Sequence, residues 1–244
     1  MSKIFMLQDY MMLLADYKNP EPHKHLAEHI IISLGQEMEW QIEQEHVRCR
    51  GICIGPDILH TGEISPDGTI VFLFTEISNY AFSLNKEYLH GRPYAIMEDE
   101  LIEQLVYEYT KLPMKEEQLG ASILSICGIT NNQKYQYEDR IREVFSYINE
   151  LKTIDHSIVE ELSQLVCLSK SRLSHLFKQQ TGMALHSYLA FEKLRKTHQY
   201  FSNEKNITQS CMLAGFDSPS HCAATCKRMF GISFTDVYKT IATN

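Results

Sequence analysis

The second half of the chain contains an internal repeat, which restricts its fold more than any other feature of the sequence. Residues 158–188 align with residues 207–237 at a constant offset of 49 positions. Each copy has the pattern of a helix, a tight turn and a second helix that ends at a glycine. The repeat therefore predicts two helix-turn-helix units side by side, at about residues 157–182 and 206–231.

The second helix of the first copy, SKSRLSHLFKQQTG, has two different faces. Leu173, Leu176 and Phe177 recur at helical spacing and form one apolar stripe. A helix that reads DNA needs such an apolar back and a polar front that faces base edges. One amphipathic helix alone is equally well explained by a solvated face, but the repeat favours DNA recognition. The polar front and its flanks are Lys170, Ser171, Arg172, Ser174, His175, Lys178 and Gln179.

The corresponding helix of the second copy keeps the spacing but has different residues. Ala223 and Ala224 occupy its polar face, and an alanine side chain donates no hydrogen bond to a base. Cys222 and Cys226 stand where the first copy has leucine and phenylalanine. A soft metal ion or a redox pair is the alternative for these cysteines, but their alignment favours a role in the core. We expect this helix to contact mainly phosphates, and its candidate DNA-binding residues are Ser218, Ser220, His221, Ala224, Lys227 and Arg228.

Charge is distributed unevenly along the chain. Residues 1–137 hold 10 Lys and Arg against 20 Asp and Glu, whereas residues 138–244 hold 13 against 11. An acidic first half and a weakly basic second half indicate two domains with different partners. Because phosphate contact depends on a local basic face, the overall pI of 5.8 is compatible with DNA binding.

No apolar run approaches the roughly 20 residues of a membrane span, and the N-terminus lacks the pattern of a signal peptide. The seven cysteines are scattered among apolar neighbours. That pattern is typical of reduced thiols, so we predict a cytoplasmic protein without membrane contact.

The first half of the chain has the residue pattern of β-strands, unlike the helical pattern of the second half. From about residue 28 to 82, short runs such as EHIIISLG and TIVFLFTEIS alternate with Gly, Pro or Asp-Gly turns, which predicts a sandwich or small barrel. From about residue 97 the period is that of helices. The prediction is an α+β multidomain chain with a sensor barrel at 1–95, a helical segment at 96–128, a linker at 129–138 and an all-α DNA-binding domain at 139–244.

The segments LSKSRLSHLFKQQTGMALHSYLAFEKLRKT and ITQSCMLAGFDSPSHCAATCKRMFGISFTDVYK resemble the C-terminal domain of AraC/XylS bacterial transcription regulators. The resemblance covers about residues 138–240. It implies a cupin-like sensor domain before the DNA-binding domain, two recognition helices in adjacent major-groove segments, and usually a homodimer. The partners that it implies are promoter DNA, RNA polymerase and a small-molecule effector. It raises the possibility that the apolar residues of the helical segment form the dimer contact, with capping of the barrel as the alternative; these residues are Leu101, Leu105, Tyr109, Leu119 and Ile123.

Histidines gather in the sensor half, in PHKHLAEHIIISLG and GPDILH. Metal-binding cupins bring three histidines and a carboxylate together from similar motifs. Here both spacings are short, and Ile58 stands where a glycine is usual, so we predict no metal and no cofactor. A small-molecule pocket is favoured over a metal site, and plain scaffold is the remaining alternative. The candidate pocket residues are His23, His25, Trp40 and His60, with a core position favoured for the tryptophan.

No arrangement of nucleophile and base emerges, so we predict a ligand-responsive transcription regulator and not an enzyme. One alternative is a metal-dependent cupin enzyme fused to DNA-binding helices. Another is a regulator whose degenerate second unit acts through protein partners.

Overall fold

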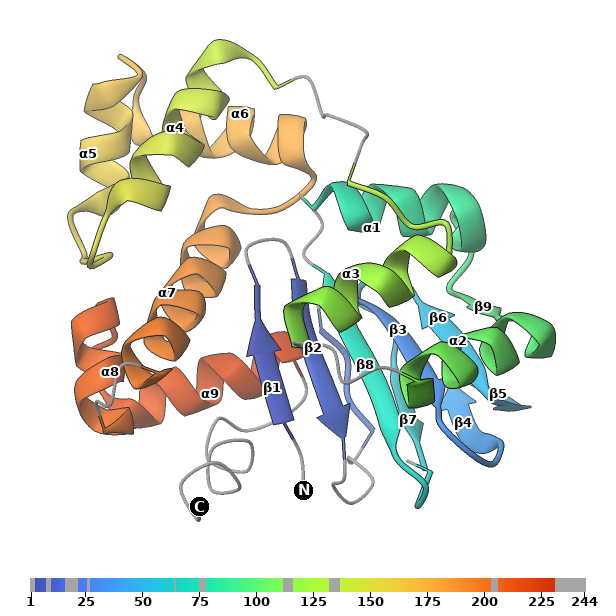
Figure 1. Cartoon of the computed structure of the whole chain (residues 1–244). Helices are drawn as coiled ribbons and strands as arrows, with labels where there is room; N and C mark the ends of the chain where they lie inside the picture. Colours follow the sequence, from blue (N-terminus) through green and yellow to red (C-terminus); the bar gives the residue numbers. More distant parts are fainter. Residues whose placement is uncertain are drawn as a thin grey trace. The chain divides into compact units, whose positions relative to one another are not determined.

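The computed structural model describes residues 3–7, 10–15, 22–25, 27–63, 65–74, 78–111, 116–131, 137–202 and 206–230. The chain divides into two compact units, one of residues 1–134 together with 228–244 and the other of residues 135–227. The first unit is built on β-sheets and the second is helical (Figure 1). None of the described helices is long and apolar enough to cross a membrane.

Two antiparallel sheets make up the first unit. The larger sheet has the order β1-β2-β8-β3-β6-β9, with strands Lys3–Met6, Tyr10–Ala15, Thr69–Phe74, Glu28–Ser33, Gly51–Ile54 and Tyr94–Ile96. The smaller sheet has the order β5-β4-β7, with strands Glu45–Cys49, Met38–Ile42 and His60–Gly62. Strands β3 and β8 are buried along their whole length, which explains their nearly continuous apolar runs.

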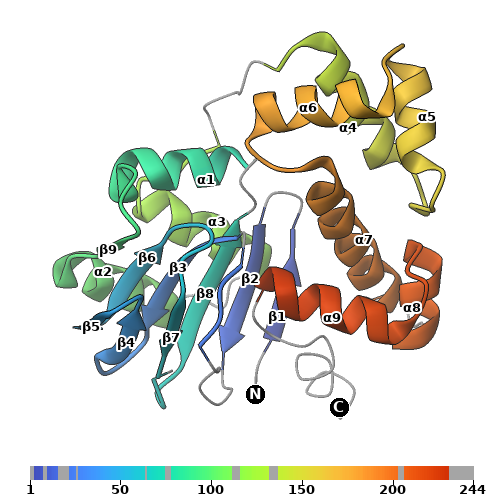
Figure 2. The same cartoon turned by 180° about the vertical axis from the view of Figure 1, so that it is seen from behind.

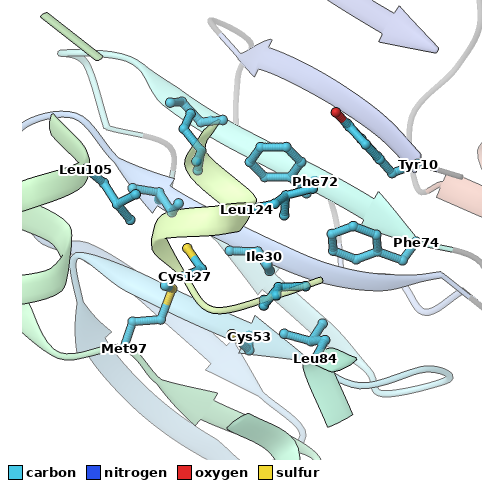
Figure 3. Packing of buried hydrophobic residues seen from close by; sticks show 14 of the residues in the cluster. Tyr10, Ile30, Cys53, Phe72, Phe74, Leu84, Met97, Leu105, Leu124 and Cys127 are labelled. Carbon is cyan, nitrogen blue, oxygen red and sulfur yellow. The ribbon is translucent and has the colours of Figure 1, made fainter. Parts of the chain in front are cut away.

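Helices cover one face of the larger sheet. Side chains alternate along a strand, so Ile30 and Ile32 of β3 point to this face while His29 and Ile31 point to the other. Ile30 joins Cys53, Phe72 and the buried residues of the helices in one apolar cluster (Figure 3). The covering helices are α1 (Asn79–Leu84), α2 (Asp99–Lys111) and α3 (Glu116–Ile126) (Figure 1).

The smaller sheet faces the opposite side of the larger one (Figure 2). Thr69 of β8 contacts the sulfur of Met38 of β4 at 3.9 Å, which links the two layers. Trp40 is 5% exposed and packs against its cross-strand partner Gly62, where any Cβ would overlap the indole ring. Trp40 is therefore part of the interior between the sheets.

Helical structure begins earlier than our sequence-based prediction of about residue 97. The helix α1 and a following π-helical stretch, Asn85–Leu89, lie between β8 and β9. Ser78 caps α1 by accepting a hydrogen bond from the backbone N–H of Tyr80 at 3.1 Å. Ala81 and Leu84 are buried in the apolar cluster, so tertiary packing holds this short helix in place.

The apolar stripe of α2 and α3 is used within the same chain. Leu105 and Ile123 are 2% and 1% exposed, and both belong to the cluster beneath the helices. Leu101, Tyr109 and Leu119 are partly buried against that cluster. The five residues assigned above to a dimer contact therefore cover the sheet. A dimer surface on these helices would have to consist mainly of other residues, because Leu105 and Ile123 already have apolar partners.

The second unit consists of six helices. They are α4 (Asp139–Glu150), α5 (Ile158–Leu165), α6 (Lys170–Thr181), α7 (Leu185–Ser202), α8 (Ile207–Ala214) and α9 (Pro219–Phe230). The bounds of α5 and α6 differ from those of α8 and α9 by 49 residues, the offset of the sequence repeat. The long helix α7 connects the two pairs (Figure 1). The glycine predicted to end the second pair, Gly231, lies outside the described residues.

Candidate nucleic-acid interface

Helix α6 has well-defined ends and an apolar side on which Leu173 and Phe177 are fully buried and Leu176 is half-buried. Ser169 caps its first turn by accepting a hydrogen bond from the N–H of Arg172 at 3.3 Å, and Gly182 ends it in the left-handed conformation. Phe177 is completely buried, and its ring centroid lies 5.5 Å from those of Phe145 and Tyr188. Aromatic pairs at this spacing each add about 0.5–1.5 kcal/mol beyond area burial. These contacts on the buried side of α6 fix the helix in the core of the second unit.

The opposite side of α6 is polar and open to solvent. Arg172, His175 and Lys178 are exposed, and none of them forms an ion pair with another described residue. Lys170 is also exposed but pairs with Glu160 of α5. Ser171 and Gln179 are exposed as well, whereas Ser174 is half-buried. The predicted polar front therefore presents two unpaired cations and an imidazole on one helix.

Helix α9 resembles α6 in its start but not in its exposed face. Ser218 accepts a hydrogen bond from the N–H of His221 at 3.1 Å, as Ser169 does in the first pair. Nδ1 of His221 lies 3.0 Å from a carboxylate oxygen of Asp217, which also holds His156. This pairing occupies one ring nitrogen of His221 with a carboxylate of the same chain. The imidazole is consequently less available to DNA than our sequence analysis assumed.

The rest of the α9 face carries few groups that can recognise a base. Ser220 and Ala224 are exposed, and Ser218 is half-buried. Lys227 and Arg228 are exposed and have no ion-pair partner within the described part of the chain. The α9 face therefore offers charge for phosphates but little for direct readout.

The core beneath α9 contains thiols in place of large apolar groups. Cys222 and Cys226 are 0% and 6% exposed, and Cys211 of α8 is buried with them. A hydrogen bond between Cys222 and Cys211 raises the pKa of Cys222 and lowers that of Cys211, while burial raises the pKa of Cys226. Among the described residues these cysteines do not join any group of three or more potential metal ligands. Their geometry agrees with a role in the core.

Thr225 adds a further weakness to this core. Its hydroxyl oxygen is buried and has no hydrogen-bond partner among the described residues. An unsatisfied buried polar group costs about 1–3 kcal/mol. The second pair also lacks a counterpart of Phe177, because Cys226 occupies the equivalent position.

We therefore expect the second pair to open more readily than the first. Amide hydrogen exchange measured along the full chain is expected to be faster in residues 207–230 than in residues 158–182. Two missing apolar side chains and one unpaired hydroxyl should make the difference about 10-fold or more. Equal or greater protection in residues 207–230 would show that other residues fill this core.

Two lysines of α7, the buried Lys196 and the half-buried Lys193, bind carbonyl groups next to the two helix pairs, a feature that the sequence did not predict. Lys196 donates a hydrogen bond to the carbonyl of Leu151 just after α4, and Lys193 donates to the carbonyl of Gly215 at 2.7 Å. Each lysine thus satisfies a carbonyl at a helix end. Burial lowers the pKa of both lysines. The only signal in the sequence was their position between the two copies of the repeat.

Four histidines meet in the first unit, including His29, which our candidate pocket omitted. His29 Nε2 lies 2.8 Å from His25 Nε2, and one ring nitrogen each of His23, His25 and His60 lie within 4.8 Å of one another. Burial, assisted by neighbouring histidines, lowers the pKa of His25 to about 2 and that of His29 well below normal. Burial also lowers the pKa of His60 to about 4. The buried rings are therefore uncharged at neutral pH.

Residues 162–240 match a helix-turn-helix domain family. The arabinose operon regulatory proteins of Salmonella typhimurium and Escherichia coli are each 30% identical to this chain over 97 residues. The matched segment is 39% of this chain and 34% or 33% of those relatives. Over these residues the helical half of the chain is similar to regulators of the AraC/XylS type. The chain spans about a third of the length of the curated relatives that it matches.

Comparison of structures extends the likeness beyond the matched helix-turn-helix residues. An apo structure of ToxT from Vibrio cholerae has a TM-score of 0.57 at 8% identity, over 94% of this chain and 97% of ToxT. A second ToxT structure has a TM-score of 0.55 at 9% identity, over 100% and 99% of the two chains. This likeness shows a shared fold, in which a β-sheet region precedes a helical region.

Proposed function

We propose that the protein is a DNA-binding transcription regulator that responds to a ligand in its first unit. The observation that carries this proposal is the exposed face of α6. Arg172 and Lys178 stand on it without ion-pair partners among the described residues, while Leu173 and Phe177 anchor its back. The AraC/XylS character of the same residues supports DNA as the partner of this face.

The two helix pairs have different roles in DNA recognition. Helix α6 is the main base reader, through residues such as Arg172 and His175, because each good bidentate contact to a base contributes about 1–3 kcal/mol of discrimination. Helix α9 contacts mainly phosphates through Lys227 and Arg228, which position the protein without specifying sequence.

The first unit serves as the sensor. Trp40 and His60 belong to the inner face of the smaller sheet, and the buried indole N–H of Trp40 has no hydrogen-bond partner among the described residues. Such a donor suits a bound polar group. One structure of ToxT contains a bound unsaturated fatty acid, which supports the proposal that this chain also binds a ligand. We also propose a homodimer and contact with RNA polymerase, in keeping with the AraC/XylS resemblance.

Selection of bound sequences from random DNA, followed by footprinting on the best site, tests the proposal. Protection of two major-groove segments roughly 34 Å apart within one subunit's site is expected if both pairs bind. Protection of one segment would confine binding to one competent pair. Absence of any selected sequence or protection at low salt would contradict DNA binding and favour a regulator that acts through protein partners.

A further inference from the structure

The histidine cluster of the first unit has the arrangement of a metal site. His23 and His60 are joined by two backbone hydrogen bonds of 3.0 and 2.9 Å, which place their rings side by side. The centroids of these two rings are 4.5 Å apart, and that of His25 lies 5.4 Å from His23 and 5.3 Å from His60. Two nitrogens bound to one tetrahedral zinc ion lie roughly 3.4 Å apart. One ring nitrogen from each of the three histidines lies at most 4.8 Å from the other two. Small rotations of the rings would therefore bring all three nitrogens within reach of one ion.

Hydrogen bonds already orient two of these rings for ligation. Nδ1 of His60 donates to the carbonyl oxygen of Ile58 at 2.8 Å, which leaves the lone pair on Nε2 for a ligand. Nε2 of His25 is engaged with His29, and Nδ1 of His25 has no hydrogen-bond partner in the described part of the chain. Histidines that bind metals usually hold their second nitrogen in this way, because the partner sets the tautomer and the ring orientation.

The cluster is difficult to explain as plain scaffold. His25 and His29 are 4% and 3% exposed, and neither buried Nδ1 has a hydrogen-bond partner of good geometry among the described residues, although backbone groups of Ala27 and Ile54 lie close enough to raise the pKa of these rings. Buried polar atoms are normally paired, so a group of imidazoles with unpaired nitrogens points to a missing ligand. His23 is only half-buried, which gives an ion a route from solvent.

The surrounding residues indicate the class of ion. Glu28, the carboxylate expected beside the histidines in a cupin-like pattern, alternates to the helix-covered face of β3, opposite to His29. No carboxylate joins the three clustered histidines among the described residues. Neutral imidazoles suit Zn²⁺, Cu²⁺, Ni²⁺ and Fe²⁺, whereas Mg²⁺ and Ca²⁺ require oxygen ligands.

We propose that His23, His25 and His60 bind one divalent transition-metal ion, with His29 as the positioning residue behind His25. Three protein ligands leave a fourth position open on the ion. This assignment replaces the expectation of no metal, which was based on the short spacing of the sequence motifs. It does not depend on DNA binding, because metal affinity is measured on the protein alone.

Equilibrium dialysis of the full chain against Zn²⁺, after treatment with a chelator, tests the site. We expect one bound Zn²⁺ per chain and a rise in the unfolding temperature with Zn²⁺ concentration. His60→Ala is expected to weaken the affinity by more than about 100-fold, and His29→Phe by about 10–100-fold, the usual effect of losing an outer-shell partner. His46, exposed on β5 of the same unit, provides the control variant His46→Ala, which should bind Zn²⁺ like the original chain.

Three results would overturn the assignment. They are less than one retained Zn²⁺ per chain at millimolar metal, equal loss of binding in His46→Ala and His60→Ala, and unchanged binding in His60→Ala. If His60→Ala does not fold, His23→Ala takes its place, because the half-buried His23 ring can be truncated with less disturbance. Circular dichroism of the metal-free variants checks folding in each case.

Discussion

Replacing Gly215 with alanine is expected to destabilise the second helix-turn-helix pair by roughly 3 kcal/mol or more. Gly215 ends α8 with φ of +98°, a conformation that side chains rarely adopt. A Cβ at this position would also overlap the backbone carbonyl of Ile154 in the segment before α5. Because the obstacle is backbone, a side-chain rotation cannot relieve it.

Gly182 provides a matched control for this change. It ends α6 with φ of +77°, yet a Cβ there would meet no atom within 4 Å. Gly182→Ala should therefore cost only the about 1–2 kcal/mol of the left-handed conformation. Amide exchange in α8 and α9 is the readout for Gly215→Ala, and an acceleration of about 100-fold is expected. Equal effects of the two substitutions on their own helix pairs would show that the close approach to Ile154 contributes nothing.

Substitutions on the two recognition helices are expected to have opposite effects on DNA binding. His175→Ala should lower the preference for the selected site over unrelated DNA by about 1–3 kcal/mol, because it removes a base-reading group from α6. Ala224→Arg should strengthen binding, because it places a long hydrogen-bond donor at a position where the alanine side chain offers none. Titration of each variant with selected and unrelated DNA of equal length measures both effects. If Ala224→Arg abolishes binding while the fold stays intact, close approach of α9 requires the alanine.

The helical half could be predicted well because its signals are local. Leu173 and Phe177 recur at helical spacing, and both are fully buried in the structure. The repeat then assigns the equivalent positions of α9 to the core, and Cys222 and Cys226 are indeed buried. The repeat left the place of Cys211 open, because contact between α8 and α9 depends on how the helices pack.

The first unit was harder to predict because its contacts join segments that are distant in sequence. The stripe of Leu105 and Ile123 showed that one face of each helix is buried, but it did not show which surface covers that face. The candidate pocket predicted from the sequence omitted His29. Alternation along β3 places Glu28 and His29 on opposite faces, and only the pairing of strands shows which of them meets His25.

The central claim is that α6 reads bases while α9 contacts mainly phosphates. A comparison of two double variants tests this claim most directly. The double variant Arg172→Ala/His175→Ala changes α6, and Lys227→Ala/Arg228→Ala changes α9. Affinity of each variant for selected and unrelated DNA is measured over a range of salt concentrations. The α6 variant should lose most of the preference for the selected site. The α9 variant should bind both DNAs more weakly to the same extent, with a salt dependence reduced by about two phosphate contacts. Loss of sequence preference in the α9 variant, with preference retained in the α6 variant, would contradict the account.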